Sequence, residues 1–302
     1  MALEVLTDIT KCQIGTVNIA RASTVTIASK ETEVDSGSDV ASGATGSDVV
    51  KQEITADIQA EDPLAIPLVL ALTGAQTLLA GGRLVNGSTY RDSSVLHCVL
   101  TAFGLTIADD QVGTCNLSLQ NRATAGNSMD DEWTGVSGTK QALPTRRSLI
   151  RIVSAVFTDD ASASLSLLGV TNTRYQMAGQ VRASNSGGDQ VLCDLVDVAS
   201  YKASGSLSLR DTQLGTAQYV AQRLAAMRRG TLVVTVKQTR QDDEASAAVN
   251  KVLTFQRIKF RNPKESKRTK DDESWDVDMN VVWTSALGAE MALANMVTIA
   301  DA

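Results

Sequence analysis

The second half of this 302-residue sequence repeats the first, and this repeat limits the folds open to the chain more than any other feature. Four short segments match in the same order: 14–18 with 168–172, 99–101 with 252–254, 109–111 with 271–273, and 115–119 with 277–281. Their separations are 154, 153, 162 and 162 residues, close to half the chain. The increase of nine indicates an insertion within 261–270, because turns accept added length and strands do not. The sequence therefore predicts a duplicated domain.

We expect two tandem domains, residues 1–145 and 146–302, which superpose over about 10–120 and 165–283. Each is predicted to be mainly β, arranged as a sandwich or barrel, with one helix per domain. The helices are expected at 67–80 and 214–229, and a polar loop at 36–48. The segment 121–157 fits no element. Alternating residues indicate strands at 15–34, 49–59, 95–107, 113–120, 190–198, 203–210, 231–237, 250–261 and 275–283.

Composition argues against several classes of function. The formal net charge of −6 disfavours a surface that grips nucleic acid, because such a surface neutralises phosphates with basic residues. The four cysteines form no CxxC pair and are interpreted as reduced, buried thiols. The longest apolar run, 64–80, contains Pro67 and is shorter than the about 20 residues of a membrane span. We expect no membrane insertion.

Chemically reactive residues are few and stand outside known motifs. The single histidine, His97, has no His, Cys or carboxylate at motif spacing and is interpreted as a partly buried strand residue. No phosphate-binding loop, dinucleotide fingerprint or hydrolase motif is present. Acidic runs at 109–110, 130–132, 242–244 and 271–273 lack the alternate spacing of calcium ligands. The sequence therefore predicts no enzymatic activity, no cofactor and no metal site.

One charged segment is a candidate contact between subunits. It falls at 261–273, where the first half has only a short turn, and its basic residues directly precede acidic ones. Ordering such a hairpin loses entropy, and a lone surface ion pair returns at most about 1 kcal/mol, so only a network of contacts would offset the loss. We expect contact with an adjacent subunit; a solvated loop is the alternative. The residues concerned are Lys264, Lys267, Arg268, Lys270, Asp271, Asp272 and Glu273.

The order of these elements resembles the tail tube proteins of long-tailed bacteriophages. The likeness is one of pattern: a strand pair with a long polar loop, one helix, and further strands with a charged hairpin, over nearly the whole chain. In that family six such domains form a ring whose strands join into an inner barrel, with the helix outside and long loops reaching the next ring. The resemblance implies that two fused domains form a trimer with pseudo-sixfold symmetry, and that the charged hairpin lies at a ring-to-ring junction.

The resemblance also implies a function and partners. The protein would be a structural virion protein of the phage tail, assembled in the host cytoplasm as stacked rings. DNA would pass through without specific binding, as the acidic balance favours. Partners would be further copies of the chain, the tape measure protein and other tail proteins. The alternatives are another virion component, from the distal tail or coat, and an oligomeric binding or adhesin module with exposed aromatic platforms.

Overall fold

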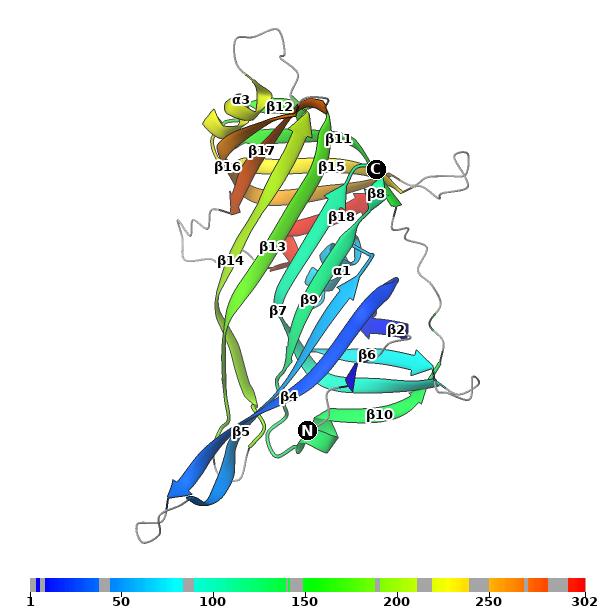
Figure 1. The fold of residues 1–302 in the computed structure, drawn as a ribbon, viewed down its shortest axis with the longest axis vertical. Coiled ribbons are helices and arrows are strands. Elements are labelled where there is room, and N and C mark those ends of the chain that lie inside the picture. Colours follow the sequence, from blue (N-terminus) through cyan, green and yellow to red (C-terminus); the bar gives the residue numbers. More distant parts are fainter. Residues whose placement is uncertain are drawn as a thin grey trace.

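A computed structural model shows long antiparallel strands side by side in a front layer, with shorter strands crossing behind them (Figure 1). The prediction of a mainly β fold is confirmed, because almost all described elements are strands of one large sheet. The structure describes residues 4–5, 9–37, 44–83, 90–139, 141, 149–187, 191–210, 219–238, 250–268, 271–281 and 293–301.

The elements are named in chain order. The strands of the first half are β1 (Glu4–Val5), β2 (Ile9–Ile14), β3 (Val17–Asn18), β4 (Ala22–Gly37), β5 (Ala44–Ala60), β6 (Gln76–Arg83), β7 (Tyr90–Ala108), β8 (Gln111–Val112), β9 (Thr114–Asn121) and β10 (Trp133–Gly138). Those of the second half are β11 (Leu149–Asp159), β12 (Ser164–Leu167), β13 (Val170–Ser184), β14 (Leu195–Arg210), β15 (Gly230–Gln238), β16 (Asn250–Arg268), β17 (Asp271–Val281) and β18 (Val297–Asp301). The helices are α1 (Ala65–Leu70), α2 (Met129–Glu132), α3 (Val220–Ala226) and the 3-10 turn η1 (Leu293–Asn295).

Strand pairing follows the same order in the two halves. The first half reads β2–β6–β7–β9–β5–β4, and the second reads β11–β15–β16–β17–β14–β13, antiparallel throughout. A short helix comes before β6 and before β15, α1 in the first case and α3 in the second. This shared order supports the expected repeat. The superposition of the two halves and the boundary between 145 and 146 stay predictions.

The long strands β7 and β16 each belong to both layers. The first residues of β7 pair with β6 and β10, and its last residues with β9 and β13. The partners change at a bulge where His97 has a φ of 51°, and Arg257 with a φ of 56° holds the same place in β16. The next residues, Cys98 and Ile258, open the pairing with β9 and β17. A bulge bends a strand and so lets it pass from one layer to the other.

The apolar core lies between the layers and is continuous across the two halves. Tyr175 of β13 packs against Phe103 of β7, with ring centroids 6.0 Å apart, and against Phe255 of β16, at 5.4 Å. Phe157 and Phe260 meet edge to face at 5.0 Å. All five rings are buried. The two halves are therefore held together by shared core packing as well as by strand pairing.

The prediction of one helix per domain is wrong in number and length. The expected helix at 67–80 is reduced to α1, and its second part is the strand β6, placed between β2 and β7. Gly74, with a φ of 72°, separates the two. A strand covered by partners and core has a largely apolar sequence, which cannot be distinguished from a buried helix by periodicity. The expected helix at 214–229 is reduced to α3, residues 211–218 lie outside the described ranges, and α2 is an additional turn.

Several loop predictions are also wrong. Strands β4 and β5 continue into the expected loop 36–48, and β16 and β17 continue into the expected insertion 261–273. The unassigned segment 121–157 contains α2, β10 and most of β11, and β14 replaces the two strands expected at 190–210. Exposed hairpin strands carry polar residues on both faces, so their sequences lack the alternation that reveals a half-buried strand.

The matched segments correspond only in part. By strand pairing Cys115 is equivalent to Trp275, so the match of 115–119 with 277–281 is two residues out but assigns each side chain to the correct face. The match of 99–101 with 252–254 is wrong. Val99 pairs with β9, whereas Val252 pairs with β15, the counterpart of β6.

Candidate assembly surface

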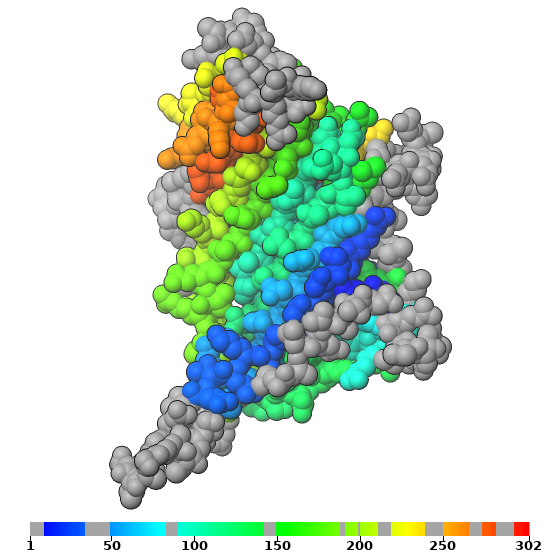
Figure 2. Space-filling model, in the orientation of Figure 1, coloured from blue at the N-terminus to red at the C-terminus, as the bar shows by residue number. Residues whose placement is uncertain are grey.

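One face of the front layer is polar across eight strands. Pairing in the order β4–β5–β9–β7–β13–β14–β17–β16 brings alternate residues of each strand to this face, and the intervening residues enter the core. We call it the polar face; Figure 2 shows it as a continuous surface of oblique strands. It carries mainly small polar and acidic side chains. They include Thr55, Asp57, Thr106, Asn116, Ser118, Arg174, Gln176, Ser204, Ser206, Ser208, Asp276 and Asp278.

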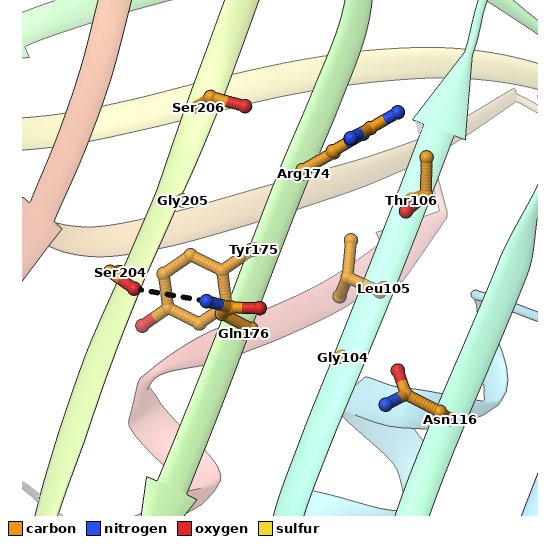
Figure 3. A pocket seen from close by; sticks show the side chains of 10 residues that line it. All are labelled: Gly104, Leu105, Thr106, Asn116, Arg174, Tyr175, Gln176, Ser204, Gly205 and Ser206. Carbon is orange, nitrogen blue, oxygen red and sulfur yellow. Dashed lines mark hydrogen bonds between the residues drawn. The ribbon is translucent and has the colours of Figure 1, made fainter.

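A shallow hollow of ≈ 430 Å³ lies where the two halves meet (Figure 3). Its floor includes Gly104, where an added Cβ would lie 2.3 Å from Oδ1 of Asn116. Gln176 donates a hydrogen bond to Ser204 across the hollow, at 3.4 Å, and Arg174 extends from β13 toward β7. The hollow is open and polar, unlike the enclosed apolar pockets that bury small ligands.

The carboxylates of the polar face accept hydrogen bonds from neighbouring side chains. Asp57 accepts from Ser118 at 2.6 Å, and Asp276 accepts from Ser208 at 2.6 Å. Asp278 accepts from Asn262 at 2.9 Å. The face therefore presents fixed acidic and small neutral groups, which offer phosphates little attraction.

Backbone pairing between β7 and β13 joins the two halves. Seven consecutive residue pairs run from Asn172 opposite Ala108 to Ala178 opposite Ala102. Much of the same stretch of β7 also pairs with β9 on its other side. The sheet consequently passes from the first half to the second without interruption.

The corresponding part of β16 has a strand on one side only. Lys264 pairs with Asp276 as Gly104 pairs with Asn116, a shift of 160 residues. Within the described ranges, β16 beyond Ile258 pairs with β17 alone. One end of the front sheet is therefore an open edge.

The other end of the front sheet is β4. It pairs with β5 along most of its length, and on its outer side the described structure shows only β1, through Glu4 opposite Ile27 and Val5 opposite Thr26. The edges formed by β4 and β16 lie on opposite sides of the front layer (Figure 1). Exposed edges are templates for pairing with another chain.

The seven charged residues predicted at a subunit contact lie on β16, β17 and their connection. Lys264 is exposed on the open edge of β16. Lys267 and Arg268 of β16, and Asp271, Asp272 and Glu273 of β17, belong to the hairpin strands, but their side chains are not described. Lys270 lies outside the described residues. The contact of these residues with another subunit stays a prediction.

Sequence analysis missed a buried carboxylate beside His97. The side chain of Glu132 is fully buried and lies with Oε2 3.0 Å from Nδ1 of His97. It also accepts hydrogen bonds from the amide of Thr124 at 2.8 Å, from Asn127 at 2.8 Å and from Asn121 at 2.9 Å. His97 thus has a carboxylate partner 35 residues away, a separation that no motif contains.

The surroundings of Glu132 keep it ionised. Burial alone raises its pKa, but the hydrogen bonds from Thr124, His97, Asn121 and Asn127 outweigh burial and bring the pKa below its ordinary value. Its two oxygens are occupied by these donors. The arrangement fixes the corner at α2 against the bulge of β7, which is a structural role.

The other candidate groups show structural environments. The four cysteines are buried and not disulfide-bonded, and burial raises the pKa of the Cys98 thiol to about 12. Across the described ranges, no group of three or more His, Cys, Asp or Glu side chains could hold a metal ion. Asp131 caps α2 through Ser128, and Asp109 accepts a hydrogen bond from the amide of Ile152; residues 242–244 are not described. In the part of the chain that is described, no helix has the length and apolar character of a membrane span.

The chain matches no protein-family model and no curated protein sequence. The proposals below are supported by the fold, its polar face and its two exposed edges.

Proposed function

We propose that this chain is a structural virion protein, the tube subunit of a bacteriophage tail, which assembles edge to edge into rings. One observation carries the proposal. The edge of β7 that joins the halves is matched by an open edge on β16, and the strand that receives it, β13, is matched by β4 at the far side of the sheet. Each copy therefore offers both halves of a junction that it already makes once internally.

A junction between unlike edges is a head-to-tail contact, which closes into a ring when the rotation per copy allows. Two halves in each chain make a ring of three copies equivalent to six similar units. Closure would remove both exposed edges, the commonest remedy for unpaired strands. We infer a homotrimer with pseudo-sixfold symmetry as the repeating ring, stacked into a tube.

The polar face is the surface proposed to line the channel. Its residues are mostly small and uncharged, and its carboxylates Asp57, Asp276 and Asp278 would repel phosphates. A channel that conducts DNA requires such weak attraction, because each phosphate neutralised by a basic side chain adds to binding. On this proposal DNA passes without specific binding, and the tape measure and other tail proteins are further partners in the virion tail.

Two other functions were considered. A distal tail or coat component could use the same two edges, and the size and stacking of its rings would differ. An adhesin or binding module needs an aromatic platform or an enclosed pocket, and the hollow at the centre of the polar face is open and polar. The edges therefore favour a ring-forming component.

Negative-stain electron microscopy of the purified protein tests the proposal. We expect rings of three chains, or stacks of such rings, over a range of protein concentration and at low salt. The proposal is wrong if only dispersed monomers are seen under all of these conditions.

A further inference from the structure

The short strand β1 lies on β4 at the place that β7 occupies on β13. Thr24 of β4 pairs with Gln59 as Asn172 of β13 pairs with Ser208, so the two strands correspond with a shift of 148 residues. This equates Thr26 and Ile27, which pair with β1, with Arg174 and Tyr175.

In the internal junction the partner at these positions is β7. Thr106 lies opposite Arg174 and Leu105 lies opposite Tyr175. Both β1 and β7 run antiparallel to the strand that they cover. β1 therefore fills, with the same direction, part of the site in which the proposed function places β16 of a second copy.

We propose that β1 is a protective strand: it covers the assembly edge of β4 in the free subunit, and β16 of a second copy displaces it when subunits join. This inference rests on the proposed function, since it takes a second copy of this chain as the partner. The edge concerned is residues 24–30 of β4, which correspond to residues 172–178 of β13.

The lengths of the two pairings favour displacement. β1 makes two residue pairs with β4, whereas the internal junction contains seven. On either side of the covered pair, Thr24, Val25, Ala28, Ser29 and Lys30 carry no β1 partner. An incoming strand can begin pairing at these positions and then replace β1 one residue at a time, because both run antiparallel to β4.

Covering an edge in the free subunit has a physical reason. An unpaired strand edge invites pairing in any register with any other strand, which leads to aggregation. A two-residue cover blocks casual pairing but yields to a partner that matches the whole edge. The second copy supplies that match through the part of β16 that includes Lys264, whose counterpart in the internal junction is Gly104.

A reversible lock on β1 tests the proposal. Val5 lies directly opposite Thr26, so cysteines at these positions are within the separation that a disulfide requires. We would prepare the full-length V5C/T26C variant oxidised and reduced, with T26C alone as the control, and follow assembly by light scattering and electron microscopy. The native cysteines are buried, which limits competing disulfides. We expect the oxidised variant to stay unassembled, and the reduced variant and T26C to assemble as the unmodified chain does.

A second variant changes β1 in the opposite sense. E4P/V5P removes both backbone N–H groups of β1 and so prevents its pairing. We expect a several-fold shorter lag before assembly, with unchanged final rings.

The outcomes separate this inference from the proposed function. Assembly of the oxidised V5C/T26C protein at the normal rate overturns the inference and leaves the ring-forming function standing. An unchanged or longer lag for E4P/V5P also overturns it. Failure of every form to assemble, E4P/V5P included, contradicts both the proposed function and the inference.

Discussion

Strands β7 and β16 occupy equivalent places in the two halves, but their edges differ in chemistry. β7 is flanked by β9 and β13 and sends Leu105, which is buried, toward the core. The equivalent residue of β16 is Glu265, which is exposed, and Lys264 stands where the first half has Gly104. The same backbone geometry thus appears once as a buried junction and once as a charged edge. Charges on an edge keep a free subunit soluble and restrict pairing to partners that accommodate them.

Breaking the internal junction should have the largest effect on stability. We expect Tyr175→Ala to lower the free energy of unfolding by about 3–5 kcal/mol, because it removes a buried ring in contact with Phe103 and Phe255. Urea unfolding measures the difference.

Tyr175→Phe is the matched control. Among the described residues, the hydroxyl of Tyr175 is buried without a hydrogen-bond partner, so its removal should be neutral or stabilising. If Tyr175→Ala costs no more than an exposed substitution such as Gln176→Ala, the two halves do not share one core.

The buried carboxylate at the bulge of β7 should have the next largest effect. Glu132→Ala leaves the amide of Thr124 and the side chains of Asn121 and Asn127 without their acceptor, and we expect a loss of about 2–4 kcal/mol. Asp131→Ala, at the exposed neighbouring position, removes only a helix cap and should cost about 1 kcal/mol. Equal losses for the two variants would show that the corner at α2 does not depend on Glu132.

The contribution of Glu132 should depend on pH. Its pKa in the folded protein lies below the ordinary value of 4.5, so its stabilising effect is fully present above that value and is lost as the pH falls through the folded pKa. Urea unfolding of the unmodified chain and of Glu132→Gln should therefore differ most near neutral pH. A difference that grows on acidification would reverse the assigned direction of the shift.

The charged edge should affect assembly more than folding. Changing Lys264, Lys267, Arg268 and Lys270 to Glu should leave the thermal unfolding of the subunit unchanged and weaken assembly, with lone pairs each contributing at most about 1 kcal/mol. Assembly of the unmodified chain should also weaken with added salt, since exposed charges are screened over about 8–10 Å at ordinary ionic strength. If the variant assembles equally well at low and high salt, the hairpin is a solvated loop. The equivalence of β16 with β7 places Lys264 at a junction within the ring rather than between rings.

Substitution of His97 should have the smallest effect. His97→Gln retains a donor for Glu132, whose other three hydrogen bonds remain. We expect a loss of less than about 1 kcal/mol in urea unfolding, with normal assembly and infectivity. Loss of infectivity by a normally folded variant would assign His97 a role that its contacts do not suggest.

The sequence predicted those parts of the fold that depend on local alternation. The run Cys115–Leu119 alternates apolar and polar residues, and it forms β9 with its apolar side in the core. It could not identify β6, because a strand with covered faces has the apolar composition of a buried helix. It also could not extend β4 and β16 into their polar hairpins, whose strands bury neither face.

The candidate surface depended more on long-range pairing than on motifs. His97 and Glu132 are 35 residues apart, and only the corner at α2 brings them together. The open edges could not be predicted either, because an edge is defined by the absence of a neighbouring strand. The charged residues from Lys264 onward were correctly singled out by composition as unusual, but their place beside an edge follows from the pairing of β16 with β17.

Cysteine cross-linking between two copies tests the central claim most directly. The internal pairing of Gln176 with Gly104 predicts that Ala28 of one copy lies opposite Lys264 of the next. Purified Ala28→Cys and Lys264→Cys chains would be mixed, allowed to assemble and oxidised, with Lys30→Cys in place of Ala28→Cys as the register control. A Thr106→Cys/Arg174→Cys chain provides the internal reference, because these residues lie directly opposite each other.

The account predicts a disulfide-linked dimer of chains from the Ala28→Cys and Lys264→Cys mixture, and a much lower yield from the register control, whose residues are diagonal neighbours about 7–8 Å apart. Rings that form without any cross-link between positions 28 and 264, while the internal reference oxidises fully, would show that the copies do not join through β4 and β16.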